Sequence, residues 1–228
     1  MQISGIVKFS TLDYPGNISA VLFSPGCNYD CFYCHNREIL RADVQLMSND
    51  DVMDFLKNRQ GLIDAVVFSG GEVTLQLDLL EWAKLVKSME YLVKIDTNGS
   101  RPDVVETLIQ AGTADYFAVD YKAPFARYTE LFRVDSEPVK QTFALLSASP
   151  VQYEARTTVI PQLTHDDLIT MAREAPVFPT YALQTYRAPE LYRPEHALLV
   201  RQKPHDTAWV EEAANVVREY QPNVVLRG

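Results

Sequence analysis

Short apolar runs alternate along the chain with longer segments in which apolar residues recur at helical spacing. Runs bounded by turn residues predict buried strands, and segments with the helical period predict helices. The predicted strands are Ala20–Ser24, Ala65–Phe68, Tyr91–Asp96, Tyr116–Asp120, Tyr153–Ile160 and Thr180–Thr185, with Val224–Leu226 as a candidate terminal strand. The predicted helices are Asn49–Arg59, Leu75–Met89, Pro102–Ala111, Pro138–Ser147, Asp166–Glu174 and Asp206–Tyr220.

This alternation of strands and helices predicts an α/β fold. Repeated strand–helix units imply a parallel sheet with right-handed crossovers. About six units are predicted, fewer than the eight that close a full barrel, so we expect a partial, open parallel β/α barrel. Nothing in the sequence marks a linker or a second domain, and we expect residues 1–228 to form a single domain. Residues 188–204 are the longest segment predicted to be irregular, and they are a candidate lid.

Composition and charge narrow the function classes. The 228 residues are 47% hydrophobic and 22% charged, which is enough for a packed core, and the net charge is −9. Such an acidic chain is a poor candidate for non-specific binding to nucleic acid or to an anionic membrane. No run approaches the ~18 apolar residues of a membrane span, and the N-terminus lacks the layout of a secretory signal. We therefore expect a cytoplasmic protein whose thiols stay reduced.

The three cysteines of the chain, Cys27, Cys31 and Cys34, all fall in the string CNYDCFYC. An odd number without a distant partner argues against a disulfide framework, and the clustering favours metal binding. Structural zinc takes four ligands, but the nearby candidate His35 directly follows Cys34 and cannot easily reach the same ion. Thiolates suit iron–sulfur clusters, and three of them would leave one iron of a four-iron cluster open. We expect a 4Fe-4S cluster, with zinc as the alternative.

Polar residues follow the predicted strands at the edge where α/β sheets bind ligands. Gly70 and Gly71, followed by Glu72, would let the backbone come close to a ligand. Asp96 begins an Asp-Thr-Asn-Gly sequence that could equally be an ordinary turn.

Charged residues stand in or beside three further predicted strands. Asp120 near a buried strand end needs a partner, either a ligand or Lys122, which faces the same side two residues later. Arg156, in the middle of a strand, needs a partner or a cavity. Gln184 lies in the sixth predicted strand, and Arg187, just after it, could join a site there.

The spacing C-x3-C-x2-C, with Tyr33 just before its last cysteine, resembles the signature of the radical S-adenosylmethionine enzymes. Together with the strings DYPG, CNYDCFYCHN, SGGE, DTNG and DYK, it makes the chain similar to the glycyl-radical-enzyme activases. Within that group it is most similar to the activating proteins of anaerobic ribonucleoside-triphosphate reductase, from about Gly5 to Arg187. The resemblance implies an open β/α barrel, a 4Fe-4S cluster on the three cysteines, and S-adenosylmethionine as cofactor.

The resemblance also implies roles for single residues. Tyr33 and His35 would lie beside the adenine, Gly71 near the methionine amine, and Asp120 with Lys122 at the ribose or carboxylate of S-adenosylmethionine. The expected cofactor-binding residues are Tyr33, His35, Gly70, Gly71, Glu72, Asp96, Asp120, Lys122, Arg156 and Gln184. Asp13, Asp96 and Asp120 match acids that surround a monovalent cation in related activases. Some activases carry a histidine where this chain has Gln184, so that contact is the weakest part of the match.

The implied activity is reductive cleavage of S-adenosylmethionine to a 5′-deoxyadenosyl radical, which takes a hydrogen atom from a glycine of a partner protein. The expected partners are anaerobic ribonucleoside-triphosphate reductase and a low-potential electron donor such as flavodoxin or ferredoxin. No general acid, general base or nucleophile is assigned, because the protein positions the cofactor and excludes water. Phe125, Tyr128 and Phe132 are candidate contacts for the partner, although their spacing is more typical of a buried helix stripe.

Two other functions stay open. A radical S-adenosylmethionine enzyme similar to 7-carboxy-7-deazaguanine synthase would act on a small pterin, although the string DYPG at residues 13–16 favours a protein substrate. A non-enzymatic zinc or iron–sulfur binding module is the second alternative.

Overall fold

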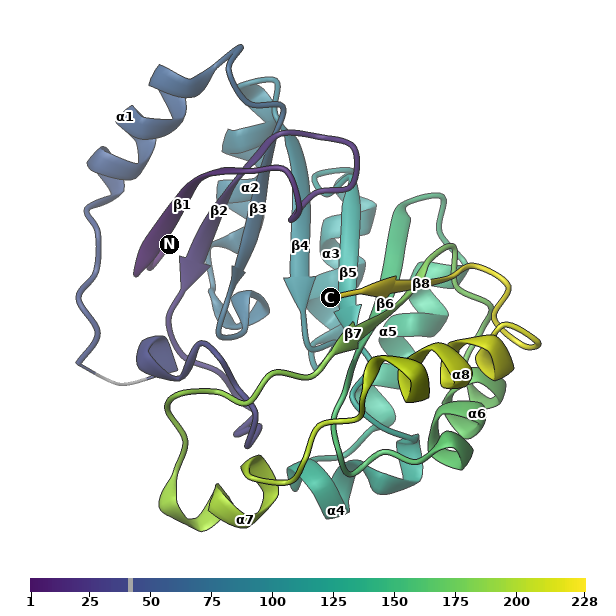
Figure 1. Ribbon diagram of the computed structural model, residues 1–228. Coiled ribbons are helices and arrows are strands. Elements are labelled where there is room, and N and C mark those ends of the chain that lie inside the picture. Colours follow the sequence, from purple (N-terminus) through teal and green to yellow (C-terminus); the bar gives the residue numbers. More distant parts are fainter. Residues whose placement is uncertain (41–42) are drawn as a thin grey trace. The chain divides into compact units, whose positions relative to one another are not determined.

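The strands of this computed structural model, which describes residues 1–40 and 43–228, are hydrogen-bonded in chain order from β1 to β8 (Figure 1). They are β1 (Gly5–Ser10), β2 (Ser19–Ser24), β3 (Ala65–Gly70), β4 (Leu92–Thr97), β5 (Tyr116–Asp120), β6 (Gln152–Val159), β7 (Tyr181–Thr185) and β8 (Val224–Arg227). β1 pairs antiparallel with β2, whereas β2 with β3, β3 with β4, β6 with β7 and β7 with β8 are parallel. The sheet is mostly parallel and open, with β1 and β8 at its edges, which confirms the predicted fold class.

The helices alternate with the strands, as predicted. They are α1 (Asn49–Arg59), α2 (Leu79–Ser88), α3 (Pro102–Gln110), α4 (Tyr128–Phe132), α5 (Glu137–Ser147), α6 (His165–Glu174), α7 (Ala197–Val200) and α8 (Thr207–Val217). Side chains cap several of them: Ser48 accepts from the Asp51 amide at α1, and Thr164 and Asp167 form a capping box at α6. None of the helices described is long and apolar enough to cross a membrane.

Three local predictions need correction. β1 was not predicted, because none of its residues is buried and it carries no buried apolar run. The helix predicted from Leu75 begins only at Leu79, because Glu72 caps a separate 3-10 turn, η2 (Val73–Leu75). The segment 188–204 is not wholly irregular, since it contains the 3-10 turn η4 (Pro194–His196) and α7. Pro194 starts this turn, as proline does at a first helical position.

The chain divides into two compact units that interleave in sequence. The first comprises Met1–Asn28, Asn36–Thr97 and Asp103–Ala118, and the second comprises Tyr29–His35, Asn98–Pro102 and Val119–Gly228. A cluster in the first unit packs Tyr14 against strand residues Val21, Ala65 and Val67. The core of the second unit is aromatic, with Tyr121, Phe143, Phe178 and Tyr181 packed against one another. The single domain and the lid stay predictions.

Candidate functional site

The Gly-Gly pair that ends β3 lies against the start of the cysteine loop. A Cβ atom on Gly71 would stand 1.8 Å from the carbonyl oxygen of Gly26, and one on Gly70 would stand 2.3 Å from that of Ser24. The Gly71 amide donates to the Ser24 carbonyl at 2.9 Å, and the Glu72 amide donates to that of Gly26 at 2.8 Å. Only glycine allows this approach of two backbones. Gly70 and Gly71 therefore fix the segment that leads into Cys27.

Glu72 is a buried acid that joins the ends of two strands. Its side chain is fully buried and accepts hydrogen bonds from the amide and hydroxyl of Thr74 and, at 2.7 Å, from the hydroxyl of Thr97. Since Thr97 is the last residue of β4, these bonds hold the β3 and β4 ends in register. Glu72 positions the strand ends, and its expected contact with the cofactor stays a prediction.

Asp96, near the end of β4, is bound by two side chains of its own unit. Ser69 donates its hydroxyl to Oδ2 at 3.1 Å, and the ammonium of Lys94 lies 3.0 Å from Oδ1. The same ammonium donates to the main-chain carbonyl of Asp13, while the Asp13 carboxylate accepts from the hydroxyl of Ser10. Lys94 thus connects the carboxylate of Asp96 with the main chain of Asp13, two of the three residues that the resemblance to activases places around a cation.

The second unit holds the remainder of the cysteine motif. The Cys34 amide donates to the Cys31 carbonyl at 3.2 Å, which closes a turn between the two cysteines. Tyr33 is buried, and its ring packs edge-on against Phe132, with centroids 6.0 Å apart. Burial raises the pKa of the Tyr33 phenol, although the charge of Lys122 opposes this. Tyr33 is therefore a neutral, packed ring beside Cys34.

Asp120, the last residue of β5, is paired with two cations. Lys122 donates to Oδ2 at 3.1 Å, and Arg156 from β6 donates to Oδ1 from Nε and Nη2 at 3.1 and 3.0 Å. Burial alone would raise the pKa of Asp120, but the two cations and their hydrogen bonds outweigh it and lower that pKa. Burial would likewise lower the pKa of Lys122, yet Asp120 holds it well above its ordinary value. All three groups stay charged at neutral pH, and the predicted pairing of Asp120 with Lys122 is confirmed.

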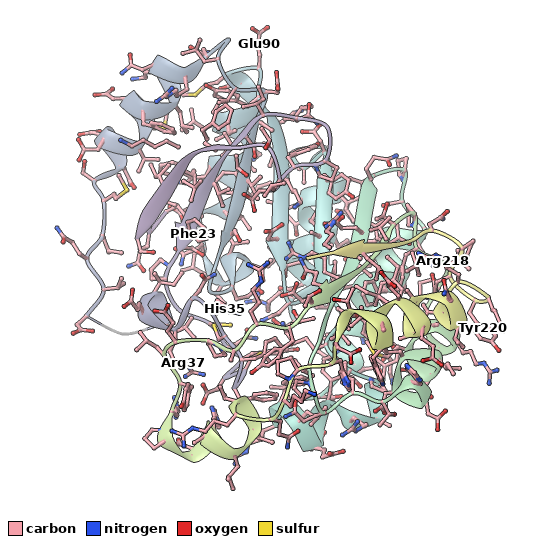
Figure 2. The ribbon with its side chains drawn as sticks, viewed as in Figure 1. Phe23, His35, Arg37, Glu90, Arg218 and Tyr220 are labelled. Carbon is pink, nitrogen blue, oxygen red and sulfur yellow. The ribbon has the colours of Figure 1, made fainter. Side chains whose placement is uncertain are left out.

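A small cavity of about 220 Å³ lies in the second unit at the ends of β6, β7 and β8. It is lined by His35, Thr158, Gln184, Thr185, Arg187, Arg227 and Gly228. Figure 2 labels His35, which is exposed and follows Cys34 directly. The structure therefore places His35 and Gln184, two of the predicted cofactor-binding residues, at one cavity, and their contact with the cofactor stays a prediction.

The cysteine motif itself passes from one unit into the other. Cys27 belongs to the first unit, and Cys31 and Cys34 belong to the second. None of the three is in a disulfide. Within the described ranges, no three His, Cys, Asp or Glu side chains could hold a single metal ion. An iron–sulfur cluster does not need three ligands on one ion, because each thiolate binds a separate iron. Three thiols are therefore a suitable donor set for such a cluster.

Three supporting residues were missed or misread in the sequence. Nothing in the sequence marks Lys94 as functional beyond the presence of a lysine in a predicted buried strand. Tyr128 and Phe132 are buried, so their assignment as partner contacts is wrong and the buried-stripe reading holds for them. Phe132 packs beneath Tyr33, and the Tyr128 hydroxyl accepts from the Lys122 amide at 3.0 Å. The Tyr33–Phe132 contact joins residues about 100 positions apart, which local patterns do not reveal.

Comparisons with known proteins agree with this arrangement. A model described as the Radical SAM superfamily matches residues 21–175. A candidate glycyl-radical enzyme activating enzyme from Methanocaldococcus jannaschii is 36% identical over 236 residues, 99% of this chain and 95% of the relative. A 7-carboxy-7-deazaguanine synthase from Clostridium acetobutylicum is 31% identical over 112 residues, 48% of this chain and 49% of that protein. The structure of Streptococcus suis SuiB bound to S-adenosylmethionine has the same fold, with a TM-score of 0.70 at 15% identity over 91% of this chain and 52% of that one.

Proposed function

The chain belongs to the radical SAM superfamily, and we propose that it installs a glycyl radical on an anaerobic ribonucleoside-triphosphate reductase. The observation that carries the activase part of this proposal is the extent of the similarity to the candidate activating enzyme from Methanocaldococcus jannaschii, which covers 99% of the chain. The reductase is proposed as the partner from the resemblance of the motifs between about Gly5 and Arg187. The similarity to the deazaguanine synthase covers 48%. Two enzymes with different substrates can share a cofactor-binding domain, and this explains a match over half of the chain. A match over nearly the whole chain also includes the parts that select the substrate.

We propose that Cys27, Cys31 and Cys34 hold a 4Fe-4S cluster. Held by these thiolates and reduced, such a cluster would supply the one-electron chemistry for cleavage of S-adenosylmethionine to methionine and a 5′-deoxyadenosyl radical. In support, the three thiols belong to one motif, and the close approach of Gly71 to Gly26 fixes the backbone where that motif begins. The electron would come from a low-potential protein such as flavodoxin or ferredoxin.

The chain's own residues bind and orient the cofactor. The Asp120 side chain is 35% exposed and is held by Lys122 and Arg156, so one face of its carboxylate is available to ribose hydroxyls. Lys122 lies 6.0 Å from the centroid of the Tyr33 ring, and its charge would favour the carboxylate of the cofactor. His35 and Gln184 line one cavity, where His35 would lie beside the adenine and Gln184 would be a further contact of the cofactor. None of these groups moves a proton in this proposal.

The test uses anaerobically reconstituted protein with dithionite, S-adenosylmethionine and the reductase. We expect a glycyl-radical doublet in the electron spin resonance spectrum, with 5′-deoxyadenosine as product. A reductase variant with alanine at its radical glycine is the matched control and should give no doublet. Other glycyl-radical enzymes, assayed side by side, identify the partner.

The similarity to the deazaguanine synthase supports a second candidate function, rearrangement of a small pterin. A parallel reaction with the pterin in place of the reductase separates the two candidates. Consumption of the pterin without a glycyl doublet would overturn the activase proposal. A colourless protein with one bound zinc and no cleavage of S-adenosylmethionine would instead support a non-enzymatic module.

A further inference from the structure

Lys94 is a buried lysine whose charge lies among oxygen atoms of its own unit. Its side chain is 3% exposed. The ammonium lies 3.0 Å from Asp96 Oδ1, donates to the main-chain carbonyl of Asp13, and sits 5.8 Å from the centroid of the Tyr116 ring. A buried ammonium is stable only where oxygen atoms and aromatic faces replace its water. The strand places it there, since Lys94 and Asp96 are two residues apart on β4 and face the same side.

This is the position at which the resemblance to activases expects a monovalent cation. Such an ion would need oxygen ligands, as other hard cations do. Asp96 Oδ1 is ion-paired with the Lys94 ammonium at 3.0 Å, and Asp96 Oδ2 accepts from the Ser69 hydroxyl. In the Asp13 loop, the main-chain carbonyl accepts from the same ammonium, and the carboxylate accepts from the Ser10 hydroxyl. A second positive charge beside the ammonium would be repelled. The third expected ligand, Asp120 in the second unit, is itself paired with Lys122 and Arg156. The residues present do not fit a free cation here.

We propose that the Lys94 ammonium takes the place of a monovalent cation at Asp96 and the Asp13 loop. Lys94 neutralises Asp96 and ties β4 to the loop that follows β1, so neither K⁺ nor Na⁺ is needed at this position. Because this ammonium is covalently attached to β4, it does not dissociate when the salt concentration falls, as a bound ion would. Lys94 is a positioning residue in this account. Its link to S-adenosylmethionine rests on the proposed function, whereas its replacement of a cation does not.

The experiment compares salts of equal ionic strength on the reconstituted protein. Thermal unfolding and the affinity for S-adenosylmethionine are measured in KCl, NaCl and choline chloride. For the wild-type chain we expect midpoints within about 1 °C of each other and affinities within about twofold, since no cation binds the folded state specifically.

The variant Lys94→Met removes the ammonium and frees the oxygens. It should unfold at a lower temperature in choline chloride and recover part of the loss in KCl, with its cofactor affinity rising at least about threefold on addition of K⁺. If Lys94→Met does not fold, Lys94→Gln takes its place in the same measurements. The matched control is Lys87→Met, which breaks the Lys87–Asp115 pair (2.8 Å) in the same unit and should lose stability equally in all three salts.

A wild-type chain that is stabilised by K⁺ over choline would overturn the proposal, because a cation would then bind beside Lys94. Variants of Lys94 without any response to K⁺ would also overturn it and leave Lys94 a structural residue. If the wild-type chain fails to bind S-adenosylmethionine in every salt, the proposed function fails, and the unfolding measurements still decide the role of Lys94.

Discussion

Arg156 donates two hydrogen bonds to one carboxylate oxygen of Asp120, from Nε at 3.1 Å and from Nη2 at 3.0 Å. The other oxygen accepts from Lys122 at 3.1 Å. The pair joins the end of β5 to the middle of β6, and the Tyr121 amide next to it donates to the Arg156 carbonyl at 2.8 Å. Side-chain and main-chain bonds therefore fix the same point of the sheet, and the carboxylate is held in one orientation.

Asp120→Asn keeps the shape of this residue and removes its charge. We expect the affinity for S-adenosylmethionine to fall by about tenfold, and the free energy of unfolding to fall by about 1–3 kcal/mol, because two cations lose their counter-charge. Iron content per chain should stay unchanged. Cofactor titration, urea unfolding and iron analysis measure the three quantities. The control is Glu130→Gln, which removes an exposed partner of Arg127 and should leave all three unchanged. Loss of iron would show that Asp120 is structural.

The stability difference between wild type and Asp120→Asn should depend on pH in one direction. The pKa of Asp120 is below its ordinary value of 3.8, so its contribution is complete above that value and is lost as pH falls through the folded pKa. The pKa of Lys122 is well above 10.5, so its contribution is complete at neutral pH and is lost only in strong base. We expect a constant difference between about pH 5 and pH 9, and a decrease below about pH 4. Urea unfolding at several pH values tests this, and a change within the neutral range would contradict it.

The close approach of Gly71 to Gly26 predicts a large effect of one methyl group. Gly71→Ala would place a Cβ atom 1.8 Å from a backbone oxygen, so one of the two segments must move. We expect a loss of about 3 kcal/mol or more in the free energy of unfolding, together with impaired uptake of iron. Gly112→Ala is the matched control, because its φ is +61° but nothing lies within 4 Å of the added atom, and it should cost about 1 kcal/mol. Equal effects of the two changes would contradict a packing role for Gly71.

Local sequence patterns predicted most of the strands because β2 to β7 are short apolar runs between turn residues. They also named Lys122 as one of two possible partners of Asp120, since a spacing of two residues places both on one face, and the structure shows this pairing. The partner of Arg156 was not predictable, because it depends on the alignment of β5 with β6, 36 positions apart. β1 was missed because an exposed edge strand has no buried apolar pattern.

Gly70 and Gly71, at the end of β3, show the same limit of prediction from local sequence. A Gly-Gly pair at a strand end predicted a backbone that comes close to something, but the sequence could not say to what. The structure places it against Ser24 and Gly26, which precede it by about 45 positions. The roles of Lys94 and Phe132 were not predicted for a related reason, because each acts through contacts with residues distant in the sequence. Such contacts are set by the folded arrangement and leave no periodic signal in the chain.

Replacement of the cysteines tests the metal group itself. Cys31→Ser and Cys34→Ala each remove one thiolate, and we expect each to abolish the absorbance at about 400 nm and all cleavage of S-adenosylmethionine. His35→Ala is the matched control, because His35 is exposed at the neighbouring position and is the alternative fourth ligand of a zinc site. It should retain the absorbance and lose only cofactor affinity. Retained cleavage in either cysteine variant would refute the assignment of these thiols. Loss of metal from His35→Ala, with zinc found in the wild-type chain, would favour a zinc module.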